Sequence, residues 1–250
     1  MKLQELVTYL NDYLRVKQVK DSAVNGLQAE GPEEVTRVAF AVDARLAAFT
    51  EAAAWGAQLL IVHHGLFWTT VQPLTGPHYR RVRALIEGDL ALYGSHLPLD
   101  MHPEIGNNAE LARVLGLRRR VPAGDYHGET IGFGGALPKP LALDALAARL
   151  TAATGCRPVR IMDAKRPARR VACVSGGAAD MARQFATLGY DTYVTGEVSH
   201  GSLPVIEELG INVIFGGHYG TETLGLKALA KHVQARFGVA THFIALPTGA

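Results

Sequence analysis

Four of the ten histidines in this 250-residue sequence follow apolar segments. His63 and His64 are adjacent and follow QLLIV, His96 follows ALYGS, and His218 follows INVIFGG. A chance scatter of histidines would not favour the ends of apolar segments so consistently. Imidazole is a ligand that Zn²⁺, Fe²⁺, Mn²⁺ and Ni²⁺ all accept, and no thiolate is needed beside it. The positions of these histidines therefore predict a site for divalent metal ions.

Two carboxylates accompany the histidines at a spacing of four residues. Asp100 follows His96 in HLPLD, and Glu222 follows His218 in HYGTE. The candidate ligands are thus His63, His64, Asp100, His218 and Glu222. One catalytic ion needs about three protein ligands, so five ligands suit two ions about 3.5–4 Å apart. Such a pair lowers the pKa of bound water toward neutrality, and hydrolysis is the reaction class that it favours.

Short apolar segments alternate with helical patterns along the chain. We expect strands at 35–43, 57–64, 89–96, 131–138, 169–177, 191–197, 211–218 and 239–246, and helices at 3–14, 44–56, 79–88, 106–117, 141–154, 178–190, 202–210 and 221–238. Strands that alternate with helices in this way form mainly parallel α/β sheets. In such sheets ligands bind beyond the carboxyl ends of the strands, which is where the candidate metal ligands fall.

The alternation is interrupted at 118–128, where a run of arginines is followed by Pro122 and Gly124. We therefore predict two α/β domains. The first comprises 1–125 plus 215–250 and carries most of the metal ligands, and the second comprises 126–214. The metal site is expected in the cleft between them, and the basic segment 117–120 is interpreted as a solvated linker.

Composition excludes several classes of protein. Lys and Arg number 25 against 23 Asp and Glu, a net charge of +2, which does not indicate a polyanionic partner. The two cysteines, Cys156 and Cys173, form no C-x-x-C pair, so a reducing, cytoplasmic location is expected. The N-terminal segment has the pattern of an amphipathic helix rather than a signal peptide, and no segment approaches the roughly 20 apolar residues of a membrane span.

Other histidines and one glycine-rich segment favour structural interpretations. His78 is expected at the surface, and His102 is a weak spare ligand. A structural role is expected for His127, His232 and His242. The turn VSGGAAD (174–180) lacks the Lys-Ser/Thr pair of a P-loop, so a tight turn is favoured over a phosphate site.

Motifs along nearly the whole chain carry a family resemblance. They are NGLQ (25–28), IVHHGLFW (61–68), YGSHLPLD (93–100), GNNAELARVLGL (106–117), TGEVSH (195–200) and GGHYGTE (216–222). In this order they resemble the Nif3-like family, also called GTP cyclohydrolase I type 2. The combination of HHG with H-x3-D and GH-x3-E is specific. One departure is Gly201, where the family often has a second histidine after TGEVSH.

The resemblance implies a two-domain α/β protein that assembles into a toroidal homohexamer, a trimer of dimers, with a dinuclear metal site in each subunit. It assigns as ligands the five residues already chosen on chemical grounds, with Glu222 as the bridge. His96 matches a histidine beside the ions and is interpreted as an acid/base residue rather than a ligand. Asn25 is expected to line the same cleft, and a pocket role for Glu197 and His200 stays open.

Two functions remain open at this point. The first is metal-dependent hydrolysis of GTP to formate and 7,8-dihydroneopterin triphosphate, or of a related nucleotide-like substrate; the same ligands would serve phosphoester or amide hydrolysis. The alternative is a non-catalytic ring that binds or delivers metal, or a scaffold that encloses nucleic acid, which the near-neutral charge disfavours. The identity of the metal is open because imidazole and carboxylate accept several ions.

Overall fold

The computed structural model describes residues 1–249, which divide into two compact units. The first unit comprises Met1–Leu99 with Leu226–Leu246, and the second comprises Asp100–Gly225 with the segment that starts at Pro247. Each unit contains one sheet covered by helices, so the predicted α/β class is confirmed. Within residues 1–249, no helix has both the length and the apolar character needed to cross a bilayer.

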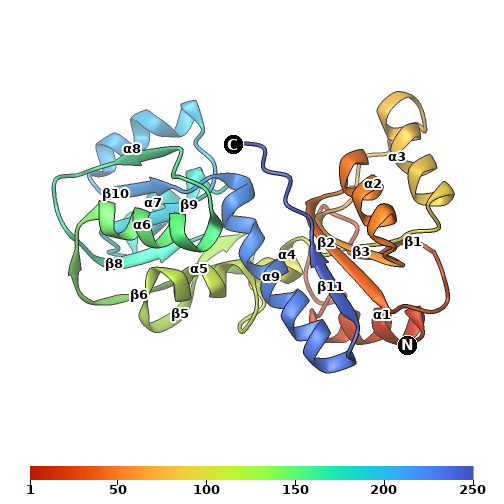
Figure 1. Ribbon diagram of the computed structural model, residues 1–250. Coiled ribbons are helices and arrows are strands. Elements are labelled where there is room, and N and C mark those ends of the chain that lie inside the picture. Colours follow the sequence, from red (N-terminus) through yellow and green to blue (C-terminus); the bar gives the residue numbers. More distant parts are fainter. Residues whose placement is uncertain (250) are drawn as a thin grey trace. The chain divides into compact units, whose positions relative to one another are not determined.

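The first unit is built on a five-stranded sheet with the order β1-β4-β3-β2-β11. Its strands are β1 (Gly26–Ala29), β2 (Arg37–Asp43), β3 (Leu59–His64), β4 (Ala91–Gly94) and β11 (Ala240–Phe243), and its helices include α1 (Leu3–Tyr13), α2 (Leu46–Trp55) and α3 (Gly76–Glu87). Strands β4, β3, β2 and β11 are parallel, and β1 pairs antiparallel with β4. Figure 1 shows β11, in dark blue, beside β2 although the two are far apart in sequence.

Burial explains why these segments form the sheet. Strands β2 and β3 are buried almost throughout, as expected of parallel strands covered on both faces. Alternate residues of the two strands, such as Ala39, Ala41 and Leu60, pack against Phe49 of α2 and Leu85 of α3. Because β2, β3 and β4 are parallel neighbours, their carboxyl ends meet at one edge of the sheet.

The second unit is built on a six-stranded mixed sheet with the order β5-β6-β8-β9-β10-β7. Its strands are β5 (Arg118–Tyr126), β6 (Glu129–Leu141), β7 (Arg160–Met162), β8 (Ala168–Cys173), β9 (Thr192–Thr195) and β10 (Asn212–Phe215), and its helices include α5 (Asn107–Leu115), α6 (Leu143–Thr154), α7 (Ala182–Thr187) and α8 (Leu203–Leu209). Strands β8, β9 and β10 are parallel. Leucines of α5 and α6 pack on Val171, Val194 and Ile214 of these strands.

Two further helices contain the points at which the chain passes from one unit to the other. Helix α4 (Leu97–Met101) contains Asp100, and α9 (His218–Phe237) begins in the second unit and ends in the first. His218 is therefore the first residue of a helix, whereas the sequence predicted the end of a strand. A four-residue spacing on a helix places His218 and Glu222 on the same face.

The structure differs from the prediction most clearly at 118–126. This segment is the edge strand β5, paired antiparallel with β6, rather than a linker. Its arginines are exposed, and charged side chains are a common protection for an edge strand. The unit boundaries follow Leu99 and Gly225 instead of residues 125 and 214, because α5 and β5 pack with β6 and α6. As a result Asp100, His218 and Glu222 all belong to the second unit.

Candidate metal centre

Three histidines of the first unit meet at the carboxyl edge of its sheet. His63 and His64 end β3, and His96 follows the neighbouring strand β4. Their ring centroids are 4.7 Å apart for His63 and His64, 5.0 Å for His63 and His96, and 5.7 Å for His64 and His96. One nitrogen of each ring lies within 4.8 Å of the others, which is a spacing that could hold a metal ion. The parallel pairing of β3 and β4 thus brings together histidines that are distant in sequence.

An oxygen acceptor fixes the tautomer of each of these rings. The Nδ1 of His63 lies 2.9 Å from the carbonyl oxygen of Ser95, and the Nδ1 of His64 lies 2.8 Å from the carboxylate of Asp43. The Nδ1 of His96 lies 3.0 Å from the carboxylate of Asp21. A carbonyl or an ionised carboxylate can only accept a hydrogen bond, so Nδ1 donates. The lone pair of each neutral ring is then on Nε2, as in metal-binding histidines oriented by an outer carboxylate.

Asp21 is the centre of a polar network that holds His96. Besides His96, the Asp21 carboxylate accepts from the backbone N–H groups of Ala23 and Leu97, both at 3.0 Å, and from Asn25 Nδ2 at 2.9 Å. Asn25 Oδ1 in turn accepts from the backbone N–H of His96 at 2.7 Å. Burial alone would raise the pKa of Asp21, but the hydrogen bond and charge of His96, with the other donors, lower the pKa to about 2. Asp21 is therefore ionised at neutral pH.

The depressed pKa of Asp21 predicts a pH-dependent contribution to stability. The folded-state pKa of about 2 lies below the value of 3.8 expected for an unfolded chain, so the stabilisation is present above pH 3.8 and lost as the pH falls through about 2. The substitution Asp21→Asn is expected to lower the free energy of unfolding by about 2 kcal/mol at pH 6. Urea denaturation at several pH values measures this difference, which should shrink below pH 3.8. The matched control is Asp12→Asn, which removes an exposed carboxylate from α1; a difference for Asp21→Asn that is independent of pH would contradict the assignment.

The second unit places one histidine between two carboxylates. The Nδ1 of His218 lies 2.6 Å from Glu197, which orients the ring as Asp43 orients His64. The Nε2 of His218 lies 3.1 Å from Oε1 of Glu222, one turn further along α9. The Glu222 side chain is 4% exposed and that of Glu197 is 53% exposed. A buried carboxylate beside an oriented imidazole is a donor pair suited to a divalent ion.

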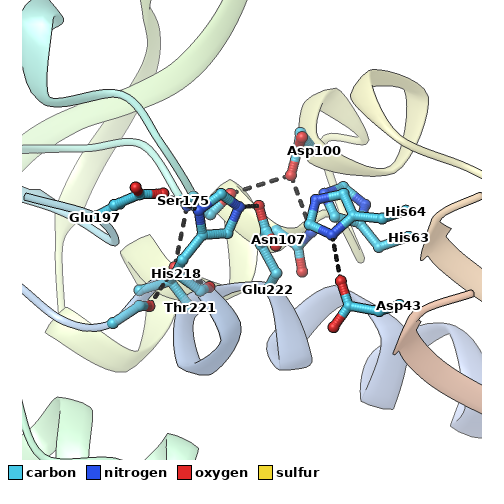
Figure 2. Close-up of polar contacts among 12 residues, drawn as sticks. Asp43, His63, His64, Asp100, Asn107, Ser175, Glu197, His218, Thr221 and Glu222 are labelled. Atoms are coloured by element: carbon cyan, nitrogen blue, oxygen red, sulfur yellow. Dashed lines mark hydrogen bonds and ion pairs between the residues drawn. The ribbon is translucent and has the colours of Figure 1, made fainter. Parts of the chain in front are cut away.

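Asp100 is held in place by an amide and a hydroxyl group. Asn107 Nδ2 donates to Asp100 Oδ1 at 2.9 Å, and Ser175 Oγ donates to the same oxygen at 3.0 Å (Figure 2). Asn107 is itself fixed, because its Oδ1 accepts from the backbone N–H of Gly225 at 2.8 Å. The neighbouring Asn108 accepts from the backbone N–H of Ser175 at 2.6 Å. The two asparagines of the GNN motif therefore position Asp100 and the loop that follows β8.

The glycine-rich loop after β8 is a tight turn, as its sequence suggested. The backbone N–H of Ser175 is used by Asn108, and that of Gly176 donates to Thr221 Oγ1 at 3.1 Å. The carbonyl oxygen of Gly176 accepts from the N–H groups of Gly196 and Glu197. These groups are thus engaged within the second unit, and the loop packs directly against His218 and Glu222.

Comparison with known proteins decides the family. Residues 1–248 match the family model described as Duf34/NIF3 (NGG1p interacting factor 3). This chain belongs to the DUF34/NIF3 family. A relative from Halobacterium salinarum is 46% identical over the full length of both chains, and one from Deinococcus radiodurans is 44% identical over 98% of this chain and 93% of its own. Both carry the name "GTP cyclohydrolase 1 type 2 homolog".

Solved structures share the fold of this chain over its whole length. The crystal structure of TTHA1606 from Thermus thermophilus has 42% sequence identity and a TM-score of 0.91 over the whole of both chains. The protein ybgI, whose structure is described as of unknown function, has 36% identity and a TM-score of 0.91, also over the whole of both chains. The predicted family resemblance is therefore confirmed.

Three further histidines of this DUF34/NIF3 protein, His78, His102 and His200, differ in their burial. His78 was predicted to lie at the surface, and this prediction is wrong: the residue is 5% exposed, because it shares the inner face of α3 with Leu85. His102 is buried, and its Nδ1 lies 3.2 Å from the backbone N–H of Ile105, which is a structural role. His200 is exposed in a single 3-10 turn.

Two orienting carboxylates, Asp43 and Asp21, were not predicted from the sequence. Asp43 ends β2 at the same edge of the sheet as His64, so the strand-end signal that identified the histidines would also have identified it. Asp21 gave no such signal, because it lies in an irregular segment between α1 and β1. Its contact with His96 follows from the pairing of β1 with β4.

Proposed function

We propose that this protein is a dinuclear metal-dependent hydrolase that acts on a nucleotide-like small molecule. His63, His64, Asp100, His218 and Glu222 would hold two divalent ions, with Glu222 as the bridging carboxylate. The donor set fits such ions, because it combines imidazoles whose Nδ1 atoms are already hydrogen-bonded with a carboxylate of low exposure. When bound, the ions would supply a water nucleophile that ionises near neutral pH and would polarise the group under attack.

The observation that carries the proposal is the orientation of four imidazoles by oxygen acceptors. Ser95, Asp43 and Glu197 hold the rings of His63, His64 and His218, and Asp21 holds His96. Histidines that bind metals or transfer protons usually donate their other ring N–H to such an acceptor. Holding a ring in one tautomer before metal or substrate arrives reduces the reorganisation needed on binding.

His96 is the proposed acid/base residue. Its ring is 21% exposed, and Asp21 keeps the proton on Nδ1 and would stabilise the imidazolium form when Nε2 accepts a proton. The proximity of His96 to His63 and His64 is equally compatible with a third imidazole ligand in the first unit. Metal analysis of a His96→Gln variant separates the two roles: retention of the full metal content with loss of turnover supports the acid/base role.

The names of the relatives suggest the first substrate to test. Metal-loaded protein incubated with GTP is expected to release formate, which can be followed by a coupled formate dehydrogenase assay. The control is the double variant His63→Ala/His64→Ala, which removes two proposed ligands. Formate release no greater than in this variant rejects the cyclohydrolase activity, and a screen of phosphoesters and cyclic amides then tests the wider hydrolase class.

We further propose that the protein assembles into a homohexamer and lies in the cytoplasm. A homohexamer of the 26.8 kDa chain would have a mass of about 160 kDa, which sedimentation or light scattering measures directly. A reducing, cytoplasmic location is consistent with Cys156 and Cys173 being present as free thiols. A predominant mass below that of a hexamer at micromolar protein would reject the ring.

Removing an orienting carboxylate is expected to weaken metal binding without removing a ligand. The substitution Asp43→Ala leaves His64 in place but frees its ring to rotate and to change tautomer. Metal affinity, measured by competition with a chromophoric chelator, is expected to fall about 10- to 100-fold. The substitution Glu87→Ala removes an exposed carboxylate of the same unit and should leave the affinity unchanged. Equal affinities in the two variants would show that Asp43 does not support a metal ligand.

A further inference from the structure

Three basic side chains lie on the segments that follow the carboxyl ends of β2 and β3. Arg45 lies between β2 and α2, while His78 and Arg81 lie one turn apart on α3, which follows β3. Arg81 Nη1 donates to the carbonyl oxygen of Ala44 at 3.4 Å, which places it next to Arg45 along the chain. The ring of His78 lies perpendicular to that of Phe67, with centroids 5.9 Å apart.

These side chains contain buried nitrogen atoms that have no hydrogen-bond partner among residues 1–249. The atoms are both ring nitrogens of His78 and the Nε atoms of Arg45 and Arg81. His78 is 5% exposed. Buried polar atoms in proteins nearly always have a partner, and an unsatisfied group calls for an explanation such as a bound ion or water. Three of these four atoms belong to α3, and Arg81 is hydrogen-bonded to the residue that precedes Arg45, so a single ligand at this place could serve both arginines.

The two helices that start in this region increase the positive potential. Arg45 occupies the N-cap position of α2, where Ser, Thr, Asp or Asn is usual, and the first turn of α2 has no acidic residue. Helix α3 also has no acidic residue in its first turn, and its N-cap Thr75 makes no side-chain capping bond in the part of the chain that the structure describes. Since helix N-termini carry partial positive charge, cations placed there repel unless an anion is present.

The carboxylate nearest to Arg45 along the chain is engaged by another side chain. Asp43 is the carboxylate closest in sequence to Arg45, and its Oδ1 already accepts from His64. The first turn of α2 is open to solvent, because Leu46 and Ala47 are exposed. A guanidinium group and a helix N-terminus together are the features that proteins use to bind phosphate groups.

We infer that Arg45, His78, Arg81 and the N-terminus of α2 form a binding site for a phosphate group. As the site of a substrate's phosphate, it rests on the proposed hydrolase function and narrows the substrate to a phosphorylated small molecule. Guanidinium N–H groups would donate to the phosphate oxygens, and His78 would add a further donor. Because the unpartnered nitrogens are buried, side chains around His78 would have to shift for the anion to reach them.

Isothermal titration of the metal-loaded protein with inorganic phosphate and with pyrophosphate tests this site, at an ionic strength kept constant with chloride. Wild-type protein is expected to bind either anion at millimolar concentration or below. Arg81→Gln and Arg45→Gln are each expected to weaken binding at least about tenfold, the effect of losing a charge-assisted hydrogen bond. The matched control is Arg80→Gln, which removes an exposed arginine from the same helix and should leave the affinity within about twofold of wild type.

Further variants distinguish this site from phosphate bound by the metal ions. His64→Ala, which removes a proposed metal ligand, is expected to keep phosphate binding. Loss of binding in His64→Ala but not in Arg81→Gln would overturn the inference and place the anion on the metals. Phosphate binding that depends on Arg81 in protein that holds no metal would support the site while the hydrolase proposal fails.

Loss of binding could also result from misfolding of a variant, so the folding of each variant is measured. If circular dichroism shows that Arg81→Gln is unfolded, Arg81→Lys is used in its place. Lysine keeps the positive charge but lacks the planar guanidinium group with its several N–H donors. Arg81→Lys is then expected to weaken binding of phosphate relative to Arg80→Lys. Equal affinities for these two variants, or the absence of binding by the wild-type protein, would overturn the inference.

Discussion

Replacing Glu222 with glutamine is expected to reduce the bound metal from two ions to at most one per chain and to abolish hydrolysis. The carboxylate is buried on α9, 3.1 Å from His218 Nε2, and is the proposed bridge between the ions. Glutamine keeps the size of the side chain but removes its negative charge and replaces one acceptor oxygen with a donor group. Metal affinity should therefore fall by more than the roughly 10- to 100-fold that the loss of an outer partner costs.

Metal analysis of protein purified without chelators, together with a chelator competition, measures this effect. The matched control is Glu208→Gln, an exposed glutamate of α8 in the same unit. Circular dichroism establishes that both variants are folded. Retention of two ions at full occupancy in Glu222→Gln would remove the bridging role and with it the dinuclear model.

The candidate metal-binding histidines could be predicted from the sequence because the pattern that marks them lies within a few neighbouring residues. In a parallel sheet the carboxyl end of a buried strand is where ligands bind, and HHG after QLLIV marks such an end without further information. The same reasoning applies to Asp43 at the end of β2. His78 was also open to prediction, because a spacing of seven residues places it on the same face of α3 as the buried Leu85.

The supporting contacts could not be predicted because they join distant segments. Asp21 lies 75 residues before His96 and reaches it only because β1 pairs with β4. Ser175 lies 75 residues after Asp100, in a loop whose course depends on hydrogen bonds to Asn108 and Thr221. The edge strand β5 was missed for another reason: a run of arginines has no apolar alternation, and it forms a strand because β6 offers a free edge.

The loop at Gly176 provides the sharpest test of how the second unit holds its candidate ligands. Gly176 has a φ of +66°, and a Cβ added there would overlap Oε1 of Glu222 and lie 3.3 Å from His218 Nε2. The loop has little freedom to move away, because the N–H of Gly176 is bound by Thr221 and its carbonyl oxygen by two further N–H groups. Alanine would therefore displace the carboxylate or the imidazole.

Gly176→Ala is accordingly expected to lower metal content about as far as loss of Glu222 does. The left-handed backbone adds a cost of about 1–2 kcal/mol for a residue with a Cβ, so the free energy of unfolding should also fall. The neighbouring substitution Gly177→Ala is the matched control, since its Cβ would lie no closer than 3.6 Å to any atom beyond the adjacent residues and the residue has no left-handed φ. Metal analysis and urea denaturation of the two variants compare these effects. Because both substitutions add one methyl group to the same loop, equal metal contents would mean that Glu222 and His218 are not held where an ion binds.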